Sequence, residues 1–594
     1  MEITERVQKL RNFMKANQID ICVIPTSDYH QSEYVGAHFK LREYLTGFTG
    51  SAGTAVFTRT KAGLWTDGRY FIQAAQQLAG TGITLYRMGE PKVESVEEFL
   101  EQELCEGGRI GIDGRTVDVD TGCRYKKIAE KKAGSLVYDL DIAGAVWEEQ
   151  PPLSEKPAFS LPICYAGKRR KDKLEEVRQA MAEQGADAHI LTSLDDIGWL
   201  LNLRGRDVEY FPLLLSYVIV EKDRVELYAD ERKFSEEIQA GFAQDGITVF
   251  PYNDIYARIK NLKAESVLLD RDRVNYSLYR NLPEHVNIIW GENPEVLMKC
   301  MKNPTEVENI RKAHIKDGVA HTKFMYWLKM HAGEESLTEL KASEKLEAFR
   351  REQEGFLCPS FDPICAYGEH GAIVHYSADE KSNARIRKGG LLLTDTGGNY
   401  WEGSTDITRT VAIGEVSEQE KRHFTLVAAA MLRLADARFL YGCSGMNLDY
   451  AAREVFWREH LNFNHGTGHG VGYLGNIHEA PIAFRWKSGK RKEQPLEEYM
   501  VITDEPGIYI EGSHGIRLEN ELLVRCGEKN EYGQFMYFEM LTFVPIDLDA
   551  IDTDRLEERE KRLLNAYHRE VYEKISPYLT PEERAWLKEY TRPV

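Results

Sequence analysis

Acidic residues and one histidine recur in a glycine-rich stretch of the chain, and their types could hold a pair of metal ions. The set consists of four carboxylates and one imidazole: Asp395, Asp406, His469, Glu505 and Glu519. Carboxylates that converge inside a protein repel one another and take up protons unless cations neutralise them. With a neutral imidazole the formal charge is −4, which two divalent ions would balance. Oxygen-rich ligation with one imidazole suits Mn²⁺ best, with Co²⁺ or Zn²⁺ as alternatives.

Two β-rich runs flank the turn between the aspartates and indicate how their carboxylates would meet. Asp395 closely follows an apolar run at 391–393, and Asp406 directly precedes a second run at 407–413. Glycines between the runs indicate a turn, so we expect an antiparallel strand pair. Both aspartates would then project from one face of neighbouring strands.

Each of these residues also has an ordinary structural interpretation when it is taken alone. An aspartate beside Thr-Gly-Gly commonly occupies a turn, and Glu505 before Pro-Gly could be a solvated strand end. Glu519 lies in an alternating pattern at 516–524 that is typical of a strand. One glycine-rich segment contains three histidines: His465, His469 and His478. The joint pattern is far more specific than any single member of it.

Length and composition limit the class of protein. At 594 residues the chain is too long for one hydrophobic core, and about three domains are expected. A formal net charge of −19 without a basic tail argues against a nucleic-acid partner. The nine cysteines are scattered singly, which indicates reduced thiols rather than a disulfide framework.

The N-terminus and the apolar runs favour a cytoplasmic protein with no membrane partner. Residues 1–6 lack the basic start and apolar core of a secretory signal. The longest apolar run, around residues 210–220, contains a proline and a serine and is well short of a membrane span.

The first half of the chain repeats an α/β pattern. Residues 64–71 (Leu-Trp-Thr-Asp-Gly-Arg-Tyr-Phe) and 227–234 (Leu-Tyr-Ala-Asp-Glu-Arg-Lys-Phe) both fit Leu-x-x-Asp-x-Arg-x-Phe, at an offset of 227 − 64 = 163. An internal duplication is the economical explanation, with the proline-bearing segment 150–157 as the linker between the copies.

A third domain would begin near Lys302. Thr305 and Glu308, three residues apart, fit a capping box that starts a long helix. The end of the chain is charged and helical in pattern at 554–575 and 581–590. Taken from the residues alone, this tail is a solvated helical cap or a dimer contact.

The metal-site segments resemble those of the pita-bread metallopeptidase superfamily (family M24), which includes methionine aminopeptidases, prolidases and aminopeptidase P. The likeness is greatest to the large, three-domain form of aminopeptidase P, and it extends to segments 42–54 and 65–70. It implies an α/β (α+β) fold, in which two related N-terminal creatinase-like α/β domains precede a catalytic pita-bread domain with a helical tail. The implied domains are residues 1–155, 156–303 and 304–594, with the helical C-terminal extension starting at about 547.

The resemblance also implies a role for each clustered residue. Asp406 and Glu519 would bridge two divalent ions, and Asp395 would chelate one of them. His469 and Glu505 would complete the other. The ions would hold a water or hydroxide and lower its pKa enough to make it a nucleophile near neutrality. Glu505 would be the general base that takes the water's proton and passes it toward the leaving nitrogen.

Four further residues match active-site positions of this family. His375 and His478 would each donate a hydrogen bond to the scissile carbonyl oxygen as it gains charge. His465 matches a third active-site histidine. Arg517 lies two residues before Glu519, on the same side of its strand, and would support the acidic cluster. The ordinary alternative for each histidine is a structural, hydrogen-bonded side chain.

The expected reaction is release of the N-terminal residue from peptides that have proline in second position. An Xaa-Pro bond is a tertiary amide without a backbone N–H, so it needs a dedicated site. The enzymatic alternative is a prolidase, which prefers Xaa-Pro dipeptides. The alternative from another class is a non-catalytic pita-bread protein that binds a partner. The resemblance also favours a homodimer.

Overall fold

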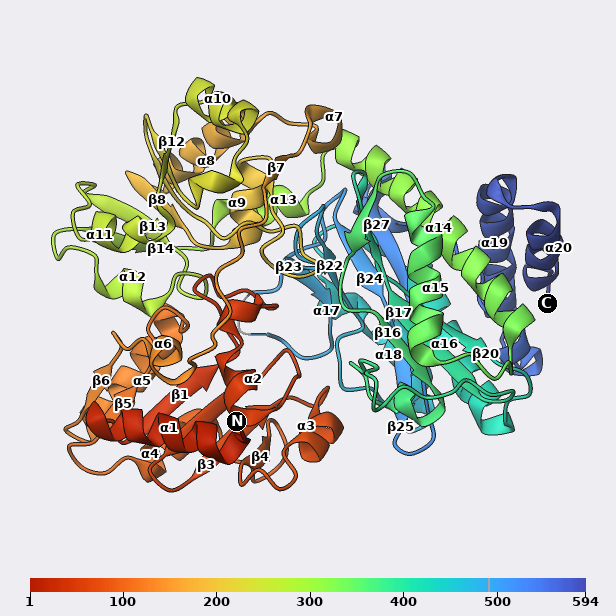
Figure 1. Ribbon diagram of the computed structural model, residues 1–594. Helices are drawn as coiled ribbons and strands as arrows, with labels where there is room; N and C mark the ends of the chain where they lie inside the picture. The colour runs from red at the N-terminus through yellow and green to blue at the C-terminus, as the bar shows by residue number, and fades with distance from the viewer. Residues whose placement is uncertain (490–491) are drawn as a thin grey trace. The chain divides into compact units, whose positions relative to one another are not determined.

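The computed structural model describes residues 1–489 and 492–594, and the chain divides into two compact units (Figure 1). One unit consists of Met1–Pro162 and Lys168–Val296, and the other of Ile163–Gly167 and Leu297–Val594. All five residues of the acidic cluster therefore belong to the second unit.

The first unit contains two six-stranded mixed sheets with the same topology. The first sheet has the order β4-β3-β2-β1-β5-β6, with β1 (Ile21–Pro25), β2 (Thr54–Thr58), β3 (Ala62–Thr66), β4 (Thr84–Arg87), β5 (Arg109–Gly111) and β6 (Ser135–Val137). The second has the order β12-β11-β10-β8-β13-β14, with β8 (Ala188–Leu191), β10 (Tyr217–Glu221), β11 (Val225–Tyr228), β12 (Ile247–Phe250), β13 (Ser266–Leu269) and β14 (Asn287–Trp290). In both orders the second and third pairings are antiparallel and the others are parallel. The predicted duplication is confirmed.

The repeated Leu-x-x-Asp-x-Arg-x-Phe segments occupy equivalent places, since they begin in β3 and in β11. After each strand the arginine folds back onto the aspartate two residues before it. Arg69 Nη2 lies 2.8 Å from Asp67 Oδ2, and Arg232 Nη2 lies 2.7 Å from Asp230 Oδ2. The repeated motif is thus a local turn that ends a strand.

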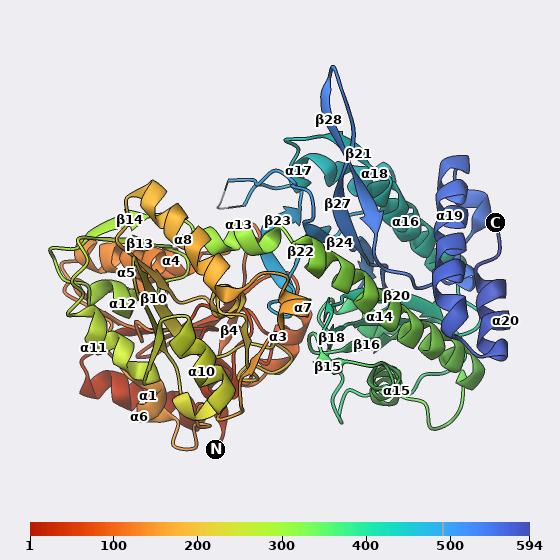
Figure 2. The same ribbon diagram turned by 90° about the horizontal axis from the view of Figure 1, so that it is seen from above.

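The second unit surrounds its sheets with long helices. Its helices include α14 (Pro304–His331), α15 (Glu339–Arg351), α16 (Glu418–Ala435), α18 (Tyr450–Arg458), α19 (Glu558–Ile575) and α20 (Pro581–Tyr590). In both views α14 runs beside the C-terminal helices α19 and α20 (Figures 1 and 2). Among the helices of the described residues, none has the length and apolar character needed to cross a membrane.

The start of α14 corrects a prediction. The Asn303 side chain accepts hydrogen bonds from the backbone N–H groups of Thr305 and Glu306, both at 3.0 Å. The Glu306 carboxylate in turn accepts the N–H of Asn303 at 2.9 Å. The predicted capping box of Thr305 and Glu308 was therefore wrong. Asn303 before Pro304 is the stronger signal, because proline at the first helical position has no N–H to satisfy.

Two sheets of the second unit carry the acidic cluster. One is the three-stranded sheet of β16 (Ile364–Tyr367), β17 (Leu391–Thr396) and β20 (Ile407–Ala412). The other has the order β21-β28-β27-β24-β22-β23, with β21 (Arg438–Leu440), β22 (Gly468–Val471), β23 (His478–Phe484), β24 (Val501–Asp504), β27 (Asn520–Asn530) and β28 (Gly533–Met540). β17 and β20 pair antiparallel, with Asp395 opposite Thr408, so the predicted strand pair is confirmed.

Candidate metal centre

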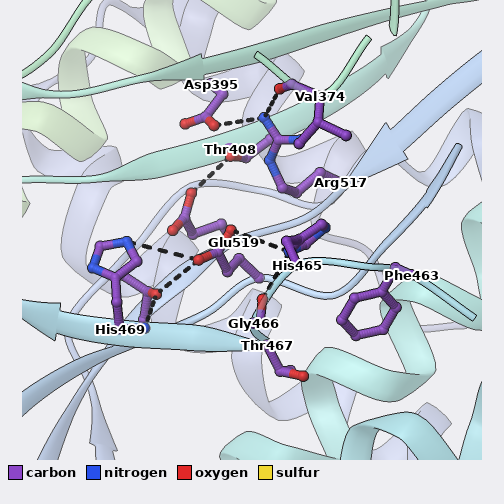
Figure 3. A network of polar contacts seen from close by, with 12 residues as sticks. Val374, Asp395, Thr408, Phe463, His465, Gly466, Thr467, His469, Arg517 and Glu519 are labelled. Carbon is purple, nitrogen blue, oxygen red and sulfur yellow. Dashed lines mark hydrogen bonds and ion pairs between the residues drawn. The ribbon is translucent and has the colours of Figure 1, made fainter. Parts of the chain in front are cut away.

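Three of the predicted ligands lie close enough together to share an ion. Ligand atoms of Asp406, His469 and Glu519 all lie within 4.8 Å of one another. Asp406 and Glu519 are buried, and His469 is partly exposed. Figure 3 shows the side chain of Glu519 between His469 and the pair formed by Asp395 and Arg517.

The other two predicted ligands border this group. His469 Nε2 lies 3.5 Å from Asp406 Oδ2 and 3.7 Å from Glu505 Oε1. Asp395 accepts a 2.6 Å hydrogen bond from Arg517 Nη2. Within the described residues, the group whose ligand atoms all lie within 4.8 Å of one another does not include Asp395 or Glu505. The structure therefore brings the five side chains into one acidic cluster with a three-residue centre.

Strand ends position these side chains. His469 lies in β22, Glu505 directly follows β24, and Glu519 directly precedes β27. β24 pairs antiparallel with both β22 and β27, so three neighbouring strands of one sheet carry these ligands. The two aspartates come from the β17–β20 pair. The N–H of Glu519 donates to the Thr408 carbonyl at 3.1 Å and joins the two sheets.

Hydrogen bonds from neighbouring residues orient two of the ligands. Thr408 Oγ1 donates to Glu519 Oε2 at 2.7 Å, and the N–H of Asp406 donates to Glu521 Oε1 at 2.7 Å. His314 Nε2 lies 3.2 Å from Glu521 Oε2, and both side chains are fully buried. The sequence alone did not single out these supporting residues. Strand alternation carried a signal for two of them, because Thr408 and Glu521 each lie two residues after a ligand.

Without cations the cluster retains protons. Desolvation by burial raises the pKa of Glu505 to about 7, against the opposing effect of His469. Desolvation, with the charge of Asp406, raises the pKa of Glu519 well above its usual value. Burial opposes the charge of His469, but its contact with Asp406 and the charge of Glu505 raise its pKa to about 9. Divalent cations would displace these protons, because metal ligands bind in their deprotonated forms.

The residues present fit a metal pair. Asp395 Oδ1 and Asp406 Oδ1 are buried and receive no hydrogen bond from the part of the chain that the structure describes. Burial of an unpaired carboxylate oxygen is unfavourable, and a bound cation would satisfy both atoms. Four carboxylates with one imidazole also form a donor set of the kind that Mn²⁺, Co²⁺ or Zn²⁺ accepts.

Two of the predicted histidines lie against the cluster. The ring of His478 packs edge-to-face on that of His469, with the centroids 4.2 Å apart and an interplanar angle of 84°. His465 Nε2 lies 2.8 Å from the Tyr509 hydroxyl, and its Nδ1 lies 3.9 Å from Glu505 Oε2. His478 and His465 thus border the cluster through different ligands.

Arg517 is buried and links the cluster to the loop that carries His375. Its Nη1 donates to the Tyr509 hydroxyl at 2.7 Å, and its Nη2 donates to Asp395 and, at 3.4 Å, to the Val374 carbonyl. The partly exposed His375 directly follows Val374. The sequence did not single out Tyr509, because a position four residues after Glu505 is too weak a signal.

Comparison with known families gives four matches that together cover most of the chain. Two match the Creatinase/Prolidase N-terminal domain, at residues 6–142 and 149–306. Metallopeptidase family M24 matches residues 308–525, and the C-terminal region of peptidase_M24 matches residues 534–594.

Similar proteins match all or a large part of the chain. Aminopeptidase P1 of Arabidopsis thaliana is 35% identical, with 100% of this chain and 99% of the relative covered. Xaa-Pro aminopeptidase 1 of Dictyostelium discoideum is 35% identical, with 100% and 97% covered. The X-prolyl aminopeptidase of Caenorhabditis elegans, described as a cytosolic enzyme with a di-nuclear active site, has a TM-score of 0.95 at 31% identity, with both chains fully covered. The Xaa-Pro dipeptidase of Bacillus anthracis has a TM-score of 0.52 at 28% identity and covers 64% of this chain and 99% of its own.

The chain belongs to metallopeptidase family M24 and, within it, to the Xaa-Pro aminopeptidases, also called aminopeptidase P. The predicted fold, with two creatinase-like domains before a pita-bread domain, is confirmed. The predicted class, a metal-dependent exopeptidase, is also confirmed.

Proposed function

We propose that the enzyme releases the N-terminal residue from peptides whose second residue is proline. The convergence of Asp406, His469 and Glu519 carries this proposal, in a chain that matches Xaa-Pro aminopeptidases from end to end. We further assign two divalent ions, most favourably Mn²⁺, to the full predicted set of Asp395, Asp406, His469, Glu505 and Glu519. When bound, the ions supply Lewis-acid chemistry, which lowers the pKa of a water molecule and polarises a carbonyl.

Glu505 is the residue best placed to move the proton. Its carboxylate lies within 3.7 Å of His469 and 3.9 Å of His465 and faces the acidic cluster. Neighbouring cations would lower its pKa and keep it ionised, as a general base must be. In this role Glu505 takes a proton from the attacking water and delivers it to the leaving proline nitrogen.

The histidines and Arg517 act on the substrate and on the cluster. We assign His375 and His478 to the scissile carbonyl oxygen, where their N–H groups stabilise developing negative charge. The contacts from His465 through the Tyr509 hydroxyl to Arg517 connect the substrate side of the site to Asp395. Because Arg517 is fully buried, it holds Asp395 in one orientation and offsets part of the cluster's negative charge.

Substrate selection follows from the chemistry of proline. Its peptide nitrogen carries no hydrogen, so a site that binds the substrate as an extended strand lacks one main-chain hydrogen bond at this residue. The acidic surroundings favour a substrate with a free N-terminal ammonium group.

We also propose a homodimer, a cytoplasmic location and domain boundaries of 1–155, 156–303 and 304–594. The cytosolic description of the Caenorhabditis elegans relative supports the location, and the family matches support the boundaries.

The decisive experiment compares a tripeptide with a dipeptide. The chelated full-length chain is reloaded with Mn²⁺ and assayed on Arg-Pro-Pro and on Arg-Pro. Asp406→Ala is assayed beside the exposed control Glu531→Ala. We expect preference for the tripeptide, loss of metal binding in Asp406→Ala, and a loss of activity larger than the roughly hundredfold typical of residues that only support a ligand. Glu531→Ala should match the unaltered enzyme.

Three other outcomes would contradict the proposal, each in a different way. A clear preference for the dipeptide would make the enzyme a prolidase. Metal binding without hydrolysis of either peptide would favour a partner-binding role. An unchanged rate in Asp406→Ala would remove the proposed site.

A further inference from the structure

Among the buried residues of the C-terminal extension, one tyrosine forms hydrogen bonds inside the catalytic unit that lead toward the acidic cluster. Tyr567 belongs to α19, which runs beside α14 at the surface of this unit (Figures 1 and 2). Its buried hydroxyl donates to the Val544 carbonyl at 2.7 Å and accepts a hydrogen bond from Arg409 Nη2 at 2.7 Å. The extension is therefore joined to β20, the strand that directly follows Asp406.

Arg409 is fully buried and is surrounded by uncharged oxygens. Its Nη1 donates to the main-chain carbonyls of Thr408 and Glu519, at 2.8 and 2.7 Å. Its remaining N–H groups donate to Asn520 Oδ1, the carbonyls of Val544 and Pro545, and the Tyr567 hydroxyl. A guanidinium has five N–H donors in a fixed plane, so this set of acceptors fixes both its position and its orientation.

Glu519 is held from two sides as a result. Thr408 Oγ1 donates to its carboxylate at 2.7 Å (Figure 3). Arg409, the next residue, projects from the opposite face of the strand and holds the Glu519 main-chain carbonyl. Any displacement of the guanidinium would therefore shift the backbone from which this ligand extends.

We propose that the C-terminal extension positions the metal centre, with Tyr567 and Arg409 as positioning residues that act through Glu519. This inference rests on the proposed function only in assigning Glu519 to a metal ion. Removal of the Tyr567 hydroxyl takes away one of the three acceptors of Arg409 Nη2 and leaves the Val544 carbonyl with the bond from that nitrogen alone. The guanidinium then loses one of its fixed points, and Glu519 loses part of its alignment.

The test substitutes the hydroxyl alone. Tyr567→Phe is compared with Tyr590→Phe, which removes a hydroxyl of the same extension that bonds Asp549 near the surface at 2.7 Å. Calorimetric titration of the chelated full-length chain with Mn²⁺ should show a dissociation constant raised about tenfold or more in Tyr567→Phe. On Arg-Pro-Pro, kcat should fall by a similar factor while KM changes less than about twofold, because the altered residue does not touch the substrate. Tyr590→Phe should leave all three quantities unchanged.

Two results would overturn the inference. One is Mn²⁺ affinity and kcat in Tyr567→Phe equal to those of Tyr590→Phe. The other is failure of Tyr567→Phe to fold, judged by circular dichroism, which would make the hydroxyl a structural group only. If the unaltered chain binds Mn²⁺ but cleaves no Xaa-Pro peptide, the proposed function fails, and the Mn²⁺ affinities still decide the role of the extension.

Discussion

Two buried acidic centres in the second unit differ in how completely the protein satisfies them. The carboxylate of Glu339, in α15, receives hydrogen bonds from the N–H groups of Tyr367 and Ala384 at 2.7 and 2.8 Å. The Tyr376 hydroxyl donates to it at 2.9 Å, and His370 Nδ1 lies at 2.8 Å. Tyr367 ends β16, and the other three partners lie in the segment 368–390 between β16 and β17, which also carries His375. The chain therefore satisfies the Glu339 carboxylate with four polar partners, and Glu339 acts as a structural anchor for them.

The metal cluster has the opposite character. Asp395 Oδ1 and Asp406 Oδ1 lack donors within the described chain, and the pKa of Glu519 is raised well above its usual value, chiefly by desolvation. A fold that supplies four contacts to one carboxylate could supply them to others. The contrast indicates that the carboxylates without donors bind cations from outside the chain, whereas the Glu339 carboxylate is already satisfied by hydrogen bonds within the chain.

Titration of the metal-free enzyme provides the largest test of this contrast. A carboxyl group whose pKa is higher in the folded chain than in the unfolded chain stabilises the folded protein at low pH. This contribution to the free energy of unfolding is lost as the pH rises from the unfolded pKa through the folded pKa. For Glu505 this window runs from 4.5 to about 7, a change on the order of 3 kcal/mol. His469 acts in the same direction, because its contribution is present below 6.5 and is lost through about 9.

We therefore expect the chelated chain to be less stable at about pH 9 than at about pH 5, and Mn²⁺ to remove this loss. Urea unfolding across the range, with and without Mn²⁺, measures both effects. A metal-free chain of constant stability would show that the cluster is as well satisfied as Glu339.

Interactions between residues that lie close together in the chain could be predicted from the sequence, and those between distant residues could not. The antiparallel pair around Asp395 and the duplicated N-terminal pattern follow from local periodicity, and the structure confirms both. The five clustered residues stood out by type and spacing, and the structure brings them together. The bond from Arg409 to Tyr567 joins positions 158 residues apart. No local pattern marks such a pair, because it depends on how the extension packs.

Glu339→Gln sharpens the comparison from the structural side. The amide keeps the size of the side chain but replaces one acceptor oxygen with a donor that faces other donors. We expect unfolding to become easier by about 1–3 kcal/mol, with Mn²⁺ affinity changed less than about twofold, since the anchor holds a loop and no ligand. Urea unfolding and Mn²⁺ titration measure the two quantities. Glu344→Gln, at an exposed position of the same helix, is the control. A large loss of Mn²⁺ affinity in Glu339→Gln would show that Glu339 also supports the metal centre and that the two centres are not independent.

The smallest expected effect concerns the hydroxyl donor that the cluster itself contains. Thr408→Val keeps the branched shape but removes the 2.7 Å hydrogen bond to Glu519, whereas Thr408→Ser retains a hydroxyl. We expect the Mn²⁺ dissociation constant to rise up to about tenfold in the valine variant, while the serine variant stays close to the unaltered enzyme. If both variants bind Mn²⁺ equally well, Glu519 depends on its backbone alone for alignment, and the contacts of Arg409 become the main support of this ligand. If both lose affinity equally, the hydroxyl is not sufficient by itself, and the methyl group that serine lacks is needed to hold it in place.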